Sequence, residues 1–196
     1  EEGKVSVDGV TYALPEPFMV IATQNPFGSV GTQKLPESQM DRFMIRVTMG
    51  YPSVEDEVSI MKSKTGGLSN RVLSKNVINA QDFMAMRDIV DEVYVDDSIY
   101  EYVAKIVAKT RDSDDILQGI SPRGSISIIN MAKAEAFLRG HDYVLPSDIQ
   151  FVLNDTMAHR IILNRSLKRG HITEESVIDS ICRSVDVPKI GTRGIL

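Results

Sequence analysis

The apolar run at residues 18–22 (FMVIA), which contains no charged side chain, constrains the fold of this chain most. Such a run is typical of a strand that is buried on both faces of a parallel sheet. It ends in Thr23, Gln24, Asn25 and Pro26, and Asn-Pro favours a turn that stops further strand pairing. In open α/β sheets, ligands bind at the carboxyl ends of the strands. The run therefore predicts a buried strand whose polar end lies beside a ligand site.

The sequence on either side of this run fits the end of an α/β core. Residues 4–13 alternate apolar and polar side chains around Asp8-Gly9, which predicts a β-hairpin with a two-residue turn. Residues 36–43 predict two helical turns that begin with Pro36. The apolar run at residues 44–49 predicts a second strand. In the helix that starts after Ser53, Val54, Val58 and Met61 form an apolar stripe.

Helical periods dominate from residue 80 onward. The predicted helices cover residues 80–90, 96–110, 121–139 and 146–157. A last helix is predicted to start at Thr173, with Glu174 and Glu175 in its first turn, and to cover residues 177–185. Residues 121–139 are the longest apolar segment and predict a central helix, whereas residues 111–118 are acidic and predict a loop. Leu145 is a weak N-cap for the helix that begins at Pro146.

Three motifs resemble those of one ATPase family. V-I-A-T-Q-N-P, G-T-x-x-L-P-E-x-Q-x-D-R-F and G-Y-P, which end at Pro26, Phe43 and Pro52, are similar to the MoxR family of AAA+ ATPases, relatives of the magnesium-chelatase ATPase subunit. The resemblance implies that Asn25 is sensor 1, which helps place the attacking water near the γ-phosphate. It also implies that Arg42 is the arginine finger, which reaches the ATP of a neighbouring subunit. From the residues alone, Asn25 can equally be a turn residue, and Arg42 can cap its helix or pair with a neighbouring carboxylate.

Arg123 is the third candidate site residue. Ser121, Pro122 and Arg123 are predicted as the N-cap and the first two residues of a helix. A cation in the first turn opposes the helix dipole, so we expect an anion near this helix end. The S-P-R motif resembles sensor 2 of AAA+ lids, which implies nucleotide binding by Arg123. The resembled family usually carries Ala where this chain has Gly124.

The composition argues against nucleic-acid binding, membrane insertion, disulfide bonding and metal binding. The net charge of -5 gives no support to a nucleic-acid or anionic-membrane surface, and so disfavours a helix-turn-helix at residues 121–157. Cys182 is the single cysteine, which excludes an internal disulfide and indicates a reducing compartment. No apolar stretch approaches the roughly 18 residues of a membrane span. The histidines His141, His159 and His171 lack metal-ligand spacing, and we predict no metal site.

The predicted fold is the end of an AAA+ α/β core with a β-hairpin (residues 1–70), followed by an all-α lid domain (residues 75–196). The chain is therefore expected to be mostly helical. It contains no G-x-x-x-x-G-K-[ST] phosphate loop and no strand ending in acidic residues for Mg²⁺. The resembled family carries both motifs upstream, and the chain begins with Glu1 rather than Met. We therefore expect a carboxyl-terminal part of an ATPase, inactive on its own.

The resemblance also implies a role for the whole protein. It is expected to bind ATP and Mg²⁺ mainly through the upstream part, to form a homo-oligomeric ring of six subunits, and to act in the cytoplasm. The expected role is chaperone-like remodelling or activation of a partner, often a protein with a von Willebrand factor A domain. A second class of function stays open: the chain can instead be a non-catalytic helical interaction module derived from an AAA+ fold. Binding of an ATP analogue by the whole protein separates the two.

Overall fold

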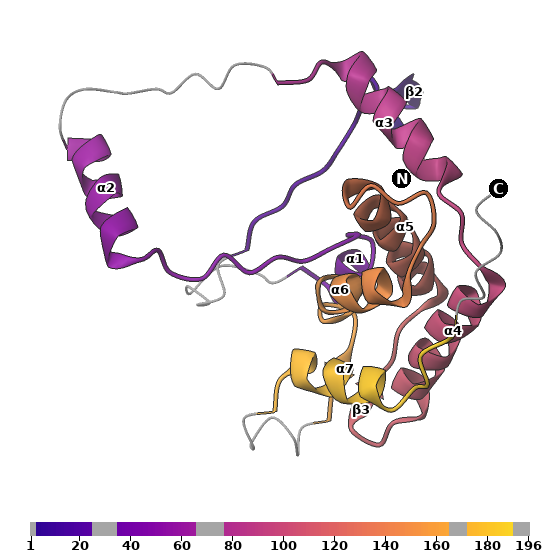
Figure 1. The fold of residues 1–196 in the computed structure, drawn as a ribbon. Coiled ribbons are helices and arrows are strands. Elements are labelled where there is room, and N and C mark those ends of the chain that lie inside the picture. The colour runs from indigo at the N-terminus through magenta and orange to yellow at the C-terminus, as the bar shows by residue number, and fades with distance from the viewer. Residues whose placement is uncertain (1–2, 25–34, 66–76, 165–171, 190–196) are drawn as a thin grey trace.

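The structure is mostly helical, with two small antiparallel sheets (Figure 1). The computed structural model of the protein describes residues 3–24, 35–65, 77–164 and 172–189. Two short strands and two helices come first: β1 (Lys4–Val7), β2 (Val10–Ala13), α1 (Glu37–Met40) and α2 (Val54–Thr65). The remaining elements are α3 (Ala80–Glu92), α4 (Asp97–Asp112), β3 (Ile116–Gln118), α5 (Pro122–Leu138), α6 (Pro146–Met157), β4 (Ile162–Leu163) and α7 (Glu174–Arg183).

The predicted hairpin is confirmed. β1 and β2 pair antiparallel, with Lys4 opposite Ala13 and Val7 opposite Val10. The turn residues Asp8 and Gly9 have φ angles of 50° and 79°. Positive φ at both turn positions belongs to the type I′ turn, whose twist matches that of the flanking strands.

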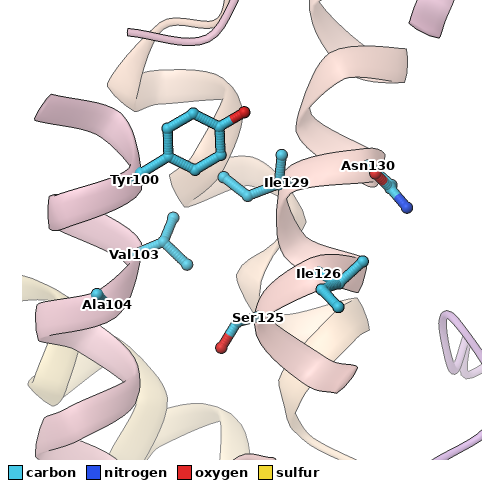
Figure 2. A pocket seen from close by; sticks show the side chains of 7 residues that line it. All are labelled: Tyr100, Val103, Ala104, Ser125, Ile126, Ile129 and Asn130. Carbon is cyan, nitrogen blue, oxygen red and sulfur yellow. The ribbon is translucent and has the colours of Figure 1, made fainter. Parts of the chain in front are cut away.

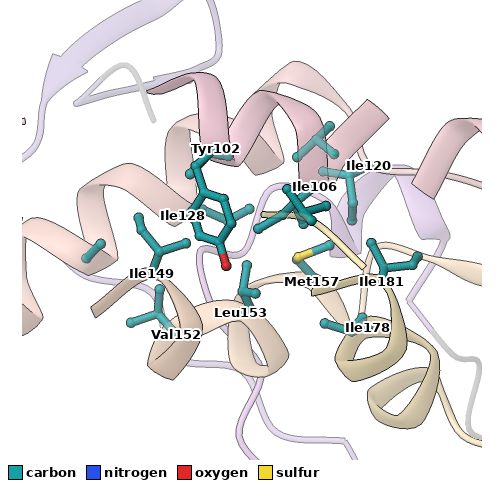
Figure 3. Packing of buried hydrophobic residues seen from close by; sticks show 14 of the residues in the cluster. Tyr102, Ile106, Ile120, Ile128, Ile149, Val152, Leu153, Met157, Ile178 and Ile181 are labelled. Carbon is teal, nitrogen blue, oxygen red and sulfur yellow. The ribbon is translucent and has the colours of Figure 1, made fainter. Parts of the chain in front are cut away.

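The hydrophobic core lies in the carboxyl-terminal half of the chain. Its buried members run from Val93 to Val185 and come mainly from α4, α5, α6 and α7 (Figure 3). Ile106, Ile128 and Ile149 are fully buried, and each comes from a different helix. α5 packs against α3, α4 and α6, which confirms the prediction that residues 121–139 form a central helix.

Local side chains set the helix ends. Ser121 and Thr173 cap α5 and α7, since their hydroxyl groups accept hydrogen bonds from the amides of Gly124 and Ser176. Gly140 follows α5 with a φ of 80°, a left-handed conformation that favours glycine. These signals act within one turn of the chain, so the sequence was sufficient to place the two ends of α5 and the start of α7.

The strands predicted at residues 18–22 and 44–49 are not formed, and these predictions were wrong. Phe18, Ile21 and Met49 are 53%, 78% and 97% exposed. A buried strand of a parallel sheet needs paired neighbours, but the described residues form only two two-stranded antiparallel sheets. The runs therefore have the composition of buried strands without strand partners.

Two further predictions need correction. Residues 111–118, predicted as a loop, include β3, which pairs antiparallel with β4. Ile116 and Leu163 oppose each other there and both are buried, so burial of apolar side chains outweighs the acidic surroundings. The apolar stripe predicted for α2 lies exposed, since α2 contains no buried residue.

Two isoleucines on α5 test the assigned core. Ile128→Ala should lower the free energy of unfolding by about 2–5 kcal/mol, because it opens a cavity at a fully buried position. Ile126→Ala is the matched control, since Ile126 is 62% exposed on the same helix, and should change stability by no more than about 0.5 kcal/mol. Urea denaturation followed by circular dichroism measures both. Equal losses in the two variants would contradict the assigned core.

Candidate functional site

The amino end of α5 forms a polar junction with a segment that lies far from it in the sequence. Asp41 directly follows α1, and its carboxylate accepts hydrogen bonds from the Ser121 hydroxyl at 3.1 and 3.0 Å. The Arg123 guanidinium lies 3.6 Å from the same carboxylate. A negative charge is favourable at the positive end of a helix, so Asp41 stabilises this end of α5.

This contact changes the interpretation of Arg123. The sequence predicted an anion near the amino end of α5, and the structure places an internal carboxylate there, that of Asp41. Arg123 therefore needs no bound nucleotide to offset its unfavourable position in the helix. Its side chain is 43% exposed, which leaves part of the guanidinium accessible from solvent.

Arg160 is the buried centre of the junction. Its side chain is only 1% exposed, and its Nε lies 3.2 Å from Oδ1 of Asp41. Its Nη2 donates to the backbone carbonyl of Phe43 at 2.7 Å, and its Nη1 to that of Met44 at 3.2 Å. Burial lowers the pKa of Arg160, and the Asp41 carboxylate opposes this shift by favouring the charged form. The other acceptors are the Asp41 carbonyl, the Ser127 hydroxyl and the Thr156 carbonyl.

His159 makes a second contact with the same segment. Its Nε2 lies 2.9 Å from the Phe43 carbonyl oxygen, so this ring nitrogen carries the proton and donates. Burial lowers the pKa of His159 to about 4, and the positive charges of Arg160 and Arg46 act in the same direction. His159 is therefore neutral at pH 7. Its Nδ1 is buried and has no hydrogen-bond partner within the described part of the chain.

The structure brings two of the three predicted site residues to one place. Arg42 is exposed and directly follows Asp41, the residue that Arg123 contacts. Asn25 lies outside the described residues. The nucleotide-binding and catalytic roles of all three stay predictions.

Asp41, His159 and Arg160 form one cluster that was not predicted from the sequence. For His159 the sequence indicated only the lack of metal-ligand spacing, whereas in the structure it bonds the Phe43 carbonyl. A signal for Arg160 was present, because its charge follows Met157 and Ala158 and precedes two isoleucines. A cation inside an apolar stretch suggests a buried charge that requires a partner.

Gly124 fits closely between this cluster and the core. A Cβ atom at this position would lie 2.5 Å from Cγ2 of Ile120 and 3.2 Å from Cδ of Arg160. The absence of a side chain thus allows the Arg160 stem to approach the first turn of α5. The structure thus gives a packing reason for glycine where the family usually carries alanine.

Two cavities of the structure are lined by residues other than those of the junction. One of about 300 Å³ lies between α4 and α5 and is lined mostly by apolar side chains, among them Val103 and Ile129 (Figure 2). Neither Arg42 nor Arg123 lines it. Over the described ranges, no three His, Cys, Asp or Glu side chains are grouped to hold a metal ion. Nor does any helix among those ranges have the length and apolar character needed to cross a membrane.

The arrangement at α5 suits the binding of an anion but not of a cation. Arg123 and the amide end of α5 can hold phosphoryl oxygens. The Asp41 carboxylate that Arg123 contacts is already bonded to Ser121 and Arg160. The amino end of α5 thus fits contact with the phosphates of a nucleotide.

The pKa of His159 predicts a pH-dependent stability. An unfolded histidine titrates near pH 6.5, whereas His159 in the folded protein titrates at about 4. Between these values the unfolded state binds a proton that the folded state does not, so the free energy of unfolding should fall as the pH falls from about 6.5 to 4. Above about pH 6.5 this contribution is constant.

His159→Gln measures this contribution. The glutamine amide can still donate to the Phe43 carbonyl but does not titrate, so the variant should lose less stability than the wild type over this pH range. His159→Asn is the matched control, since its shorter amide cannot reach Phe43 and should be less stable at every pH. Urea denaturation at intervals from pH 7 to pH 4 gives the three curves. Parallel curves for the wild type and His159→Gln would contradict the assignment.

Comparisons with known proteins agree with this architecture. The family described as "ATPase family associated with various cellular activities (AAA)" matches residues 1–45, and the family described as "AAA lid domain" matches residues 108–181. The first match ends one position after Met44, whose carbonyl Arg160 contacts. The second contains Arg123 and Arg160.

Individual relatives make the family assignment more specific. The chain is 42% identical to the uncharacterized protein YeaC of Bacillus subtilis, over 96% of this chain and 58% of the relative. It is 33% identical to chaperone MoxR1 of Mycobacterium tuberculosis, over 97% of this chain and 52% of the relative. A crystal structure of a putative ATPase from Cytophaga hutchinsonii superposes with a TM-score of 0.84 at 34% identity, over 96% of this chain and 59% of that one.

The chain spans little more than half the length of the relatives that it matches. The matches combine an AAA segment, an AAA lid domain and relatives named MoxR. The chain therefore belongs to the MoxR family of AAA ATPases.

Proposed function

We propose that this chain is the part of a MoxR-type ATPase that senses the nucleotide and supplies an arginine to the neighbouring subunit. The whole protein then couples ATP hydrolysis to the remodelling or activation of a partner protein. One observation carries the proposal for this chain: Asp41, which directly precedes Arg42, is also the ion-pair partner of Arg123. The segment of the proposed finger thus contacts the proposed sensor 2.

Arg123 is the residue that contacts the nucleotide of its own subunit. It lies in the first turn of α5, where backbone amides also point toward an anion. Its planar guanidinium can bond phosphoryl oxygens through two N–H groups at once. The Asp41 carboxylate contacts the same guanidinium, so phosphate and carboxylate compete for Arg123.

Arg42 is the arginine finger and acts on the ATP of the adjacent subunit. It is exposed, as a residue that reaches another subunit must be. A finger stabilises the negative charge of the transferred phosphoryl group. Asn25, as sensor 1, orients the attacking water without adding charge. This division of roles requires a homo-oligomeric ring, which we take to contain six subunits.

The remaining nucleotide contacts come from sequence that this chain does not contain. A phosphate loop supplies the backbone amides and the lysine that hold the β- and γ-phosphates, and an acidic strand end holds Mg²⁺. The name of the M. tuberculosis relative, a chaperone, supports a remodelling role. We take the partner to be a protein with a von Willebrand factor A domain, and the compartment to be the cytoplasm.

The isolated chain should not hydrolyse ATP and should bind it weakly at most, because it lacks the phosphate loop. A steady-state ATPase assay of purified residues 1–196 measures this, with the whole protein as the positive control. Turnover by the isolated chain comparable to that of the whole protein would contradict the proposal. If the whole protein binds no ATP analogue, the chain is a non-catalytic interaction module instead.

The finger role of Arg42 can be tested by mixing subunits. Arg42→Ala in the whole protein should leave ATP binding intact and lower turnover by roughly 10³-fold or more. A second variant that lacks the phosphate-loop lysine should be inactive because it cannot hold ATP productively. Where the two variants meet in one ring, one subunit supplies an intact pocket and the other an intact arginine. ATPase rate against mixing ratio should therefore show a maximum.

Each variant alone is the control for the mixing experiment. Subunit exchange is verified separately, for example by energy transfer between labelled subunits. Near-zero rates at every ratio, with exchange demonstrated, would mean that Arg42 acts within its own subunit or only caps its helix.

A further inference from the structure

We propose that Arg160 is a positioning residue that fixes residues 41–46, the segment that carries Arg42, to the helical lid. The importance of this anchor for catalysis rests on the proposed finger role of Arg42. The anchor itself does not rest on it, because it follows from contacts among described residues.

The backbone carbonyls of the segment depend on Arg160 for hydrogen bonds. Residues 41–46 belong to no helix or strand, so the structure gives them no regular backbone pairing. The carbonyl oxygens of Asp41, Phe43 and Met44 all accept from the Arg160 guanidinium instead. Backbone carbonyls held against a protein core require such donors. Arg160 therefore replaces the pairing that a strand partner would otherwise supply.

The geometry of the guanidinium suits this set of contacts. It offers five N–H groups in a fixed plane, whereas a lysine ammonium offers three from a single point. On the lid side, Arg160 also bonds the Ser127 hydroxyl of α5 at 3.0 Å and the Thr156 carbonyl of α6. One rigid group thus ties α5, α6 and the segment together, and lysine cannot reproduce that set of contacts.

Other contacts also attach residues 41–46 to the lid. His159 bonds the Phe43 carbonyl, the Arg46 amide donates to the Asp155 carbonyl at 2.8 Å, and the Arg46 side chain lies 3.3 Å from Glu175. These contacts reach the segment from α7 as well as from the end of α6. The bond between Arg46 and Asp155 also provides a backbone amide that reports directly on the anchor.

The consequence concerns how the finger is oriented. Because Asp41 is bound to Arg160 and Arg42 is the next residue, a displacement of the lid displaces the backbone of Arg42 with it. A catalytic group that is misplaced by about 1 Å can lose a large factor in rate. Arg160 therefore sets the position of Arg42 without touching the nucleotide.

The anchor is tested first in the chain itself, by amide hydrogen exchange measured by NMR. Arg160→Lys keeps the charge but loses most of the contacts, and it should accelerate exchange of the Arg46 amide by about tenfold or more. The buried amides of Ile106 and Ile149 should keep their wild-type rates. The matched control is Arg139→Lys, since the ion pairs and ring contact of Arg139 involve Glu135, Asp148 and Phe151 of the lid. Wild-type exchange at Arg46 in Arg160→Lys would overturn the anchor.

A second variant keeps this test decisive if Arg160→Lys also loosens the core. Asp41→Asn removes the carboxylate and leaves the backbone carbonyls in place, so it should accelerate exchange at Arg46 by a smaller factor than Arg160→Lys does. If Arg46 in Asp41→Asn exchanges as in the wild type, the ion pair contributes nothing to the anchor and the proposal fails.

The positioning role is tested in the whole protein. Arg160→Lys should lower kcat for ATP hydrolysis by about tenfold or more while KM and the affinity for an ATP analogue stay at wild-type values. Arg139→Lys should keep the wild-type kcat. Faster exchange at Arg46 together with an unchanged kcat would overturn the positioning role. If the wild-type whole protein hydrolyses no ATP, the proposed function fails, and the exchange experiment still decides whether the anchor exists.

Discussion

The ion pair between Arg160 and Asp41 joins two parts of the chain that are separated by 119 positions. Burial of a guanidinium is costly unless a carboxylate and further acceptors surround it. Here the acceptors come from a segment without regular secondary structure and from two lid helices. The attachment of residues 41–46 to the lid thus depends on satisfying one buried charge, while the lid itself depends on its apolar core. Loss of Arg160 would remove the donor that the carbonyls of Asp41, Phe43 and Met44 share. The Asp41 carboxylate would keep its contacts with Ser121 and Arg123.

The parts of the fold that the sequence predicted well are those set by local rules. The type I′ turn at Asp8-Gly9 and the cap at Ser121 depend on residues within one turn of the chain. The strands predicted at residues 18–22 and 44–49 depend on partners instead. Their apolar composition indicates which surface they need, but only a neighbouring strand can provide it, and the described residues supply none. The same limit explains β3, which exists because β4 pairs with it from far along the chain.

The candidate site shows the same division between local and distant causes. A cation in the first turn of α5 predicts an anion nearby, and this electrostatic argument was correct. It could not identify the anion, because Asp41 lies 80 positions from Ser121. Arg160 was missed for a similar reason, since its acceptors are backbone carbonyls, which every residue carries. A buried cation in an apolar stretch indicates that partners exist, but their identity requires the fold.

Two arginines share one carboxylate, and their burial gives them different tasks. The side chain of Arg123 is 43% exposed and that of Arg160 is 1% exposed. Water can replace a carboxylate around the exposed guanidinium at small cost, whereas it cannot reach the buried one. Under the proposed function, a phosphate group can therefore draw Arg123 from Asp41 while Arg160 continues to neutralise that carboxylate. The exchange of partners at Arg123 then leaves no uncompensated buried charge, and the segment that carries Arg42 stays attached to the lid throughout.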